Sequence, residues 1–128
     1  MKSHEFLANV RDRGNYADQA EAQRVTGAVL SILAQRLGAG EAKDVAAQLP
    51  TDLQDAMTTG IGPAESFGVE EFLARVARAL DTSTETAKWD ASAVLTTLAE
   101  ALSGGELNQV LTRIQSGYAV LFGKPDLA

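Results

Sequence analysis

An internal repeat constrains the fold of this chain more than any other feature of its sequence. The segment EFLANV at residues 5–10 returns as EFLARV at 71–76, at an offset of 66. The segment LAQRLGAGE at 33–41 returns as LAEALSGGE at 98–106, at an offset of 65. One residue has therefore been lost between the two blocks. A repeat of this length is typical of a duplicated helical unit.

The composition favours helices over strands. Hydrophobic residues make up 45% of the 128 residues, and aromatic residues only 5%. Much of the apolar share is alanine and leucine, which are strong helix formers, and runs of β-branched residues are scarce. A chain of this length can bury a core without disulfides, and there is no cysteine to form one.

Apolar residues that recur every three or four positions predict the helices of both units. The expected helices of the first unit span about 3–13, 18–37, 41–49 and 51–59. In the second unit the first helix spans about 69–80, a long helix follows the helix-start cluster at 82–85 and ends near 102, and Leu107, Val110, Leu111 and Ile114 line the next helix. A last apolar stretch contains Tyr118, Leu121 and Phe122. Asp18 and Ser103 are each followed three residues later by glutamate, which is the spacing of a capping box at a helix start.

A segment rich in glycine and proline separates the two units. It spans 60–68 and shows no hydrophobic period, which is typical of a connector. A single unit cannot bury both faces of its helices, so we expect the two to share one core. The predicted organisation is one compact domain over 1–128, with a first repeat at 3–59 and a second at 69–124. The predicted fold class is an all-α, pseudo-two-fold bundle of about eight helices.

Several of these segments resemble a known family. They are EFLA at 5–8, the turn at 37–41, AQLP at 47–50 and EFLARV at 71–76. Over about residues 3–122 the chain resembles the bacterial domain-of-unknown-function family 2267 (DUF2267). The resemblance implies an all-helical, duplicated fold and a bacterial, cytoplasmic protein, and it supplies no active site to transfer.

The second half departs from that family pattern at one turn. The place of QLP at 48–50 is taken by RIQ at 113–115, so the proline is missing. Proline fixes its own backbone angle and suits the start of a helix. We therefore expect the second turn to be reshaped.

Charge and terminal sequence argue against two classes of partner. The formal net charge is −6, whereas a general nucleic-acid binder needs a basic surface. No apolar run approaches the roughly 20 residues of a membrane helix, and the first residues contain no signal-peptide core. We expect a cytoplasmic protein that binds neither nucleic acid nor membrane.

No residue pattern predicts catalysis or a metal site. The single histidine, His4, lies beside the N-terminus. Acidic residues occur in pairs at three predicted helix starts: Glu41 with Asp44, Asp52 with Asp55, and Glu70 with Glu71. Negative charge is favoured there by the helix dipole. We therefore predict no catalytic residue, no cofactor and no metal; an enzyme would need a buried carboxylate pair, which spacing alone does not reveal.

Basic residues are few and are expected on solvated helix faces. Arg75 and Arg78 lie three residues apart in one predicted helix, and Arg11 and Arg13 end its counterpart. A nucleic-acid surface would need more of them, interleaved with aromatic residues.

Trp89 is the one candidate interaction residue. Helical periodicity places it opposite the apolar face of its helix. Two alternatives follow: a neighbouring helix covers the indole, or the indole is exposed and anchors a partner. We expect a non-enzymatic module that binds an unidentified protein or a second copy of itself. The alternative is a small-molecule sensor with a pocket between the repeats.

Overall fold

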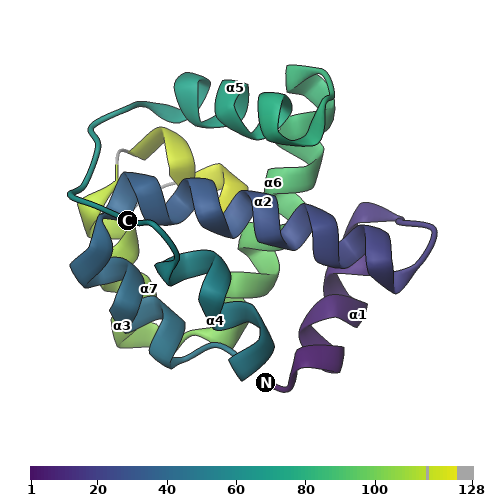
Figure 1. Cartoon of the computed structure of the whole chain (residues 1–128), viewed down its shortest axis with the longest axis horizontal. Helices are drawn as coiled ribbons and strands as arrows, with labels where there is room; N and C mark the ends of the chain where they lie inside the picture. Colours follow the sequence, from purple (N-terminus) through teal and green to yellow (C-terminus); the bar gives the residue numbers. More distant parts are fainter. Residues whose placement is uncertain (115, 124–128) are drawn as a thin grey trace.

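The protein is all-helical, as predicted. The computed structural model describes residues 1–114 and 116–123, and all regular elements in this part are helices (Figure 1). The elements are α1 (Ser3–Gly14), α2 (Gln19–Leu37), α3 (Ala39–Ala47), α4 (Thr51–Thr58), α5 (Val69–Leu80), α6 (Thr84–Ala101), α7 (Gly104–Arg113) and a 3₁₀ helix, η1 (Ser116–Phe122). None of the helices in this described part combines the length and apolar character needed to cross a bilayer.

The two longest helices, α2 and α6, pack against each other in the middle of the molecule (Figure 1). Helix α1 packs on both α2 and α6, and α5 also packs on both. The core combines residues of both halves that match in the repeat. Four such pairs are fully buried: Phe6 with Phe72, Val10 with Val76, Leu30 with Leu95, and Leu33 with Leu98. The pseudo-two-fold relation between 3–59 and 69–124, and these domain bounds, stay predictions.

The turns between the first two helices of each unit show where the repeat lost a residue. Helices α1 and α5 both end on a left-handed residue, Asn15 and Asp81, with φ of 54° and 53°. These two positions are 66 apart. The following helices begin after the side-chain caps Asp18 and Ser83, which are 65 apart. The first turn is therefore one residue longer, and Tyr16 lies in it.

The connector at 60–68 lies against the end of α2. The Glu65 amide donates a hydrogen bond to the Gln35 carbonyl at 3.0 Å. Gly38 ends α2 with φ of 86°, and a Cβ at this position would meet the Ala64 nitrogen at 2.6 Å. Only glycine allows both this backbone angle and this close approach.

The second unit ends differently from the first, at the turn where its sequence departs from the family pattern. In the first unit Pro50 caps α4 with φ of −54°, the angle that its ring imposes. The matching position, 115, lies outside the described residues, and the helix that follows is the 3₁₀ helix η1. Its residues Tyr118, Leu121 and Phe122 are nevertheless buried, as predicted.

Candidate functional site

A groove lies between the turn after α1 and the turn after α5. Its volume is about 390 Å³, and both halves of the chain line it. The side chains that give it chemical character are Tyr16, Glu21, Arg24, Asp81, Trp89 and Asp90. The groove therefore combines two aromatic rings with three carboxylates and one guanidinium.

Trp89 is the most exposed aromatic side chain at this groove. Its exposed fraction is 57%, which favours the exposed alternative of the two considered for it. The neighbouring residues Ala87 and Ala91 face the core, and Trp89, between them, points away because successive helix residues turn by about 100°. Its Nε1 donates a hydrogen bond to the Gly14 carbonyl oxygen at 2.9 Å. The indole is thus held by α1 while its face is open to solvent.

Tyr16 and Asp90 form a hydrogen bond beside Trp89. The Tyr16 hydroxyl donates to Asp90 Oδ1 at 2.6 Å, and Asp90 is buried. Burial and the adjacent Asp90 carboxylate raise the pKa of Tyr16. Burial also raises the pKa of Asp90, while the Tyr16 hydrogen bond and the Arg24 charge oppose that rise.

Sequence reasoning missed Asp90, although the signal was present. Asp90, Val94 and Leu98 are four residues apart and lie on the buried face of α6. A carboxylate in an apolar stripe needs a buried donor. Tyr16, which lies in the longer turn of the repeat, supplies it.

A second cluster lies where α3 packs against α7. Gln48, at the end of α3, accepts a hydrogen bond from the Ser103 amide at the start of α7 (2.8 Å). Arg113, at the end of α7, pairs with Glu41 at the start of α3 (Nε to Oε2, 3.3 Å). The two helices are therefore antiparallel. Between these contacts the Glu41 and Glu106 carboxyl groups lie within hydrogen-bonding reach of each other.

The capping box predicted at Ser103 is only half formed. The Glu106 amide donates to Ser103 Oγ at 3.1 Å, as expected. The reciprocal contact is absent, because the Ser103 amide donates to Gln48 instead. In α3 the cap is Gly38, whose amide donates to the Ala34 carbonyl. Neither glutamate is held by its own helix start, so both carboxylates are available to each other.

The Glu41 side chain is almost wholly buried, with 1% of its area exposed. Burial raises its pKa to about 7, and the adjacent Glu106 carboxyl adds to the rise. The sequence interpretation, in which Glu41 and Asp44 merely face the helix dipole, is incomplete for Glu41. Glu41 and Glu106 are equivalent positions in the repeat, but equivalence along the chain does not show that their carboxyl groups meet.

The family comparison agrees with the sequence resemblance. The model of the family described as "Uncharacterized conserved protein (DUF2267)" matches residues 3–121. The chain belongs to the DUF2267 family. No curated protein matches it. The DUF2267 match spans the helices that carry both the Trp89 groove and the Glu41–Glu106 pair.

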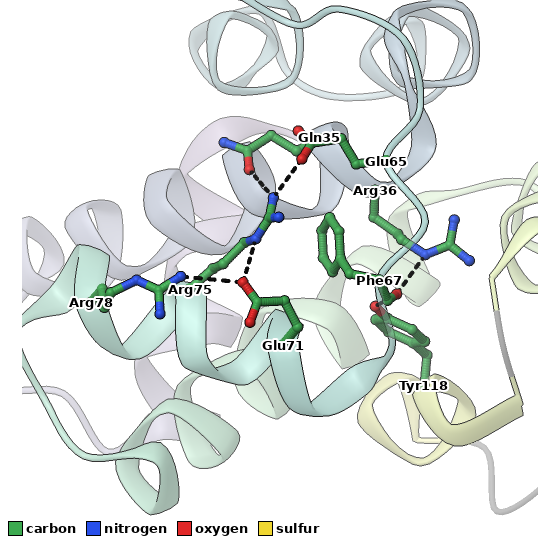
Figure 2. A network of polar contacts seen from close by, with 8 residues as sticks. All are labelled: Gln35, Arg36, Glu65, Phe67, Glu71, Arg75, Arg78 and Tyr118. Carbon is green, nitrogen blue, oxygen red and sulfur yellow. Dashed lines mark hydrogen bonds and ion pairs between the residues drawn. The ribbon is translucent and has the colours of Figure 1, made fainter.

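In this DUF2267 protein Arg75 is not on a solvated helix face, contrary to the sequence prediction. Figure 2 shows its guanidinium between α5, α2 and the connector. It donates to Glu71 Oε2 at 2.9 Å, to Gln35 Oε1 at 3.0 Å and to Glu65 Oε1 at 3.1 Å. Its Cζ lies 4.0 Å from the centre of the Phe67 ring. Arg75 therefore fixes α5 to α2 and to the connector through its Nε and Nη1 groups.

The other arginines differ in exposure. Arg78 is solvated as predicted, with 66% of its side chain exposed, and it makes one further contact to Glu71 (Figure 2). Arg13, by contrast, joins α1 to α6 through Glu100 at 2.6 Å and Thr97 at 2.8 Å.

The other sequence candidates are not brought together. His4 is exposed at the start of α1. Within residues 1–114 and 116–123, no group of three or more histidine or acidic residues is arranged to hold a metal ion.

Proposed function

We propose that this DUF2267 protein is a non-enzymatic protein-binding module and that its partner docks on the Trp89 groove. The observation that carries the proposal is the exposed indole, fixed by its hydrogen bond to Gly14 at the mouth of a groove that both halves line. Tryptophan is the residue type most often responsible for binding energy in protein interfaces. An indole that is already fixed loses little conformational entropy when a partner covers it.

The charges of the groove support a basic partner segment. Glu21, Asp81 and Asp90 line it, against the single cation Arg24. A lysine or arginine of the partner would meet this excess of carboxylates and could stack on the open face of Trp89. The net charge of −6 supports the same polarity. We expect binding to weaken as ionic strength rises.

The test compares two exposed apolar positions. Proteins of the source bacterium would be captured on the wild-type chain, on Trp89→Ala and on Val120→Ala, since Val120 is 55% exposed on η1. Each protein retained by the wild type and by Val120→Ala but lost on Trp89→Ala would then be purified. Its Kd should rise at least about tenfold with Trp89→Ala and change little with Val120→Ala. Equal affinity for all three chains would contradict the proposal.

A second copy of the chain is the other protein occupant to test. Trp89 is the only tryptophan, so its fluorescence reports on this groove alone. Self-association through the groove would shift the emission to shorter wavelength as protein concentration rises, and light scattering would show a dimer that Trp89→Ala abolishes. A strict monomer with no retained partner would rule out both protein occupants.

The groove also supports the alternative of a small-molecule sensor. Its volume of about 390 Å³ lies within the range of ligand pockets. The Tyr16–Asp90 pair would supply the few polar groups that orient a ligand. A metabolite that quenches or shifts Trp89 emission at micromolar concentration, and does so less on Tyr16→Phe, would favour the sensor.

We propose that the chain is not an enzyme, even though it contains a buried carboxylate pair. A general acid or base must reach the substrate, and only 1% of the Glu41 side chain is exposed. We also expect the chain to act in the bacterial cytoplasm without binding nucleic acid. An electrophoretic shift assay at low salt tests the last point.

A further inference from the structure

We propose that Glu41 and Glu106 form a proton-operated latch: a proton shared between their carboxyl groups holds α7 on α3, and loss of that proton loosens α7. The latch is independent of the Trp89 groove, which lies at the turns after α1 and α5. It would make the seating of one helix depend on pH near neutrality.

The geometry requires a proton between the two side chains. Glu41 Oε1 and Glu106 Oε2 are both buried, and neither has a hydrogen-bond donor among the described residues. Two ionised carboxylates side by side would repel each other and leave both oxygens unsatisfied. If one carboxyl is protonated, its O–H donates to the other and both groups are satisfied. The arrangement is therefore stable with one shared proton and strained without it.

The charged groups around Glu41 do not remove this requirement. Arg113 of α7 pairs with the other oxygen, Oε2, at 3.3 Å, and its side chain is 59% exposed, so its charge is screened by solvent. Asp44 of α3 adds a like charge. Arg36 of α2 donates its Nε to the Phe67 carbonyl at 2.9 Å and its Nη2 to the backbone carbonyl of Arg113 at 3.4 Å, so its two contacts are to backbone oxygens.

Within the described part of the chain, α4 and η1 add no buried charge there, and Asp52 and Asp55 of α4 are exposed. The buried residues of α4 are Leu53 and Met57, which are apolar. The titratable residue of η1, Tyr118, donates its hydroxyl to the Phe67 carbonyl at 2.7 Å. Beside the solvent-screened charge of Arg113, a proton shared between the two carboxyl groups can neutralise the pair.

Helix α7 is held by few other contacts, so one proton can decide its position. It packs on α3 and η1, and Val110 is its one buried residue, while Leu107 and Leu111 are partly buried. The Gln48–Ser103 hydrogen bonds at its start are exposed to solvent, and the bond from Arg36 Nη2 to the Arg113 carbonyl at its end is long, at 3.4 Å. Elements with little buried apolar surface are the ones that open locally.

The direction of the pH effect follows from linkage. The pKa of Glu41 is raised to about 7 by burial and by the Glu106 carboxyl, against an ordinary value of 4.5. A carboxyl whose pKa is raised by folding stabilises the seated state at acid pH. That contribution decreases above the unfolded value and is lost as the pH rises through about 7.

Hydrogen exchange of the full chain at roughly pH 5.5 and pH 8.5 tests the latch. After correction for intrinsic exchange, protection of the α7 amides should fall about tenfold or more at the higher pH, while α2 and α6 stay protected. Glu106→Gln keeps the hydrogen bond without the charge, so its α7 amides should stay protected at both pH values. The matched control is Glu85→Gln, which alters an exposed glutamate in the first turn of α6 and should retain the wild-type pH dependence.

Two results would overturn the latch. One is α7 protection that does not depend on pH in the wild type, and the other is Glu106→Gln with the same pH dependence as the wild type. Should Glu106→Gln not fold, a ¹³C NMR titration of the wild-type carboxyl groups decides the question. The Glu41 carboxyl should titrate near neutrality, and titration of Glu41 at an ordinary glutamate value would contradict the proposal.

Discussion

Two of the places where one half of the chain packs on the other, the α1–α6 contact and the α5–α2 contact, use different polar contacts. At the contact of α1 with α6, Arg13 reaches Glu100, and Tyr16 donates to the buried Asp90. At the contact of α5 with α2, Arg75 reaches Gln35. Glu100 and Gln35 are equivalent positions, 65 apart, but the two arginines come from different turns of their helices.

The residue that completes each of these two contacts also comes from a different part of the chain. The α1–α6 contact is completed by the turn residue Tyr16, which exists because the first turn is one residue longer. The α5–α2 contact is completed by Phe67 of the connector, whose carbonyl accepts from Arg36 and Tyr118. The matched apolar residues thus recur in both halves, while each polar contact depends on a residue that only one half has.

The largest effect is expected from Phe67→Ala. Phe67 is buried beneath the Arg75 guanidinium. Removing its ring should lower the free energy of unfolding by about 3 kcal/mol, because a cavity forms at the α5–α2 contact. Urea denaturation measures the loss. Val120→Ala shortens an exposed side chain and should lower the free energy of unfolding by less than about 0.5 kcal/mol. Equal losses for Phe67→Ala and Val120→Ala would show that the connector is not part of the core.

Tyr16→Phe should have the next largest effect. It leaves the buried Asp90 carboxylate without its donor, which should cost about 2 kcal/mol at neutral pH. The matched change at the other contact, Tyr118→Phe, should cost less, about 1 kcal/mol, because the Phe67 carbonyl keeps its bond from Arg36 at 2.9 Å. Denaturant unfolding of both variants gives the comparison directly.

Tyr16→Phe should also change the pKa of Asp90. Burial raises the pKa of Asp90 and the Tyr16 hydrogen bond lowers it, so Tyr16→Phe should raise this pKa further. The stability lost in Tyr16→Phe should therefore shrink as the pH falls through the raised pKa of Asp90. A ¹³C carboxyl titration checks the direction, and an unchanged or lower pKa of Asp90 would contradict the structure.

Arg75→Gln should destabilise the chain less than Tyr16→Phe, and part of its effect should depend on salt. Its contacts to Glu65 and Glu71 are exposed ion pairs, with 50% and 44% of the glutamate side chains exposed. Such pairs weaken when salt screens them. Unfolding at low and high ionic strength should bring the variant and the wild type closer together at high salt, and a difference independent of salt would assign the effect to Phe67 packing.

Arg13→Gln should have the smallest effect. Its partner Glu100 has 48% of its side chain exposed, so the ion pair should contribute about 0.5 kcal/mol. The low value would confirm that Tyr16–Asp90, rather than the arginine, fixes α1 to α6. A cost above that of Tyr16→Phe would reverse this order. Thermal unfolding of Arg13→Gln, of Tyr16→Phe and of the variant with both changes measures the contributions of the ion pair and of the Tyr16–Asp90 hydrogen bond.

Helix positions and the apolar core could be predicted from the sequence because both follow from local chemistry. Asp18 and Ser83 mark the helix starts by accepting amide hydrogen bonds, as their side chains allow. The three- and four-residue spacing placed Phe6, Phe72 and their neighbours in the core, where they are. The same spacing predicts Trp89 off the core face, and the structure adds that 57% of it is exposed.

The apolar face of each helix follows from the order of residues along the chain, because the helical period is a property of consecutive residues. Which polar groups meet, by contrast, depends on how the helices pack in three dimensions. Glu41 finds Glu106, and Tyr16 finds Asp90, across helices distant in the chain. Such encounters depend on how the helices cross, and the spacing of residues within one helix carries no information about that crossing.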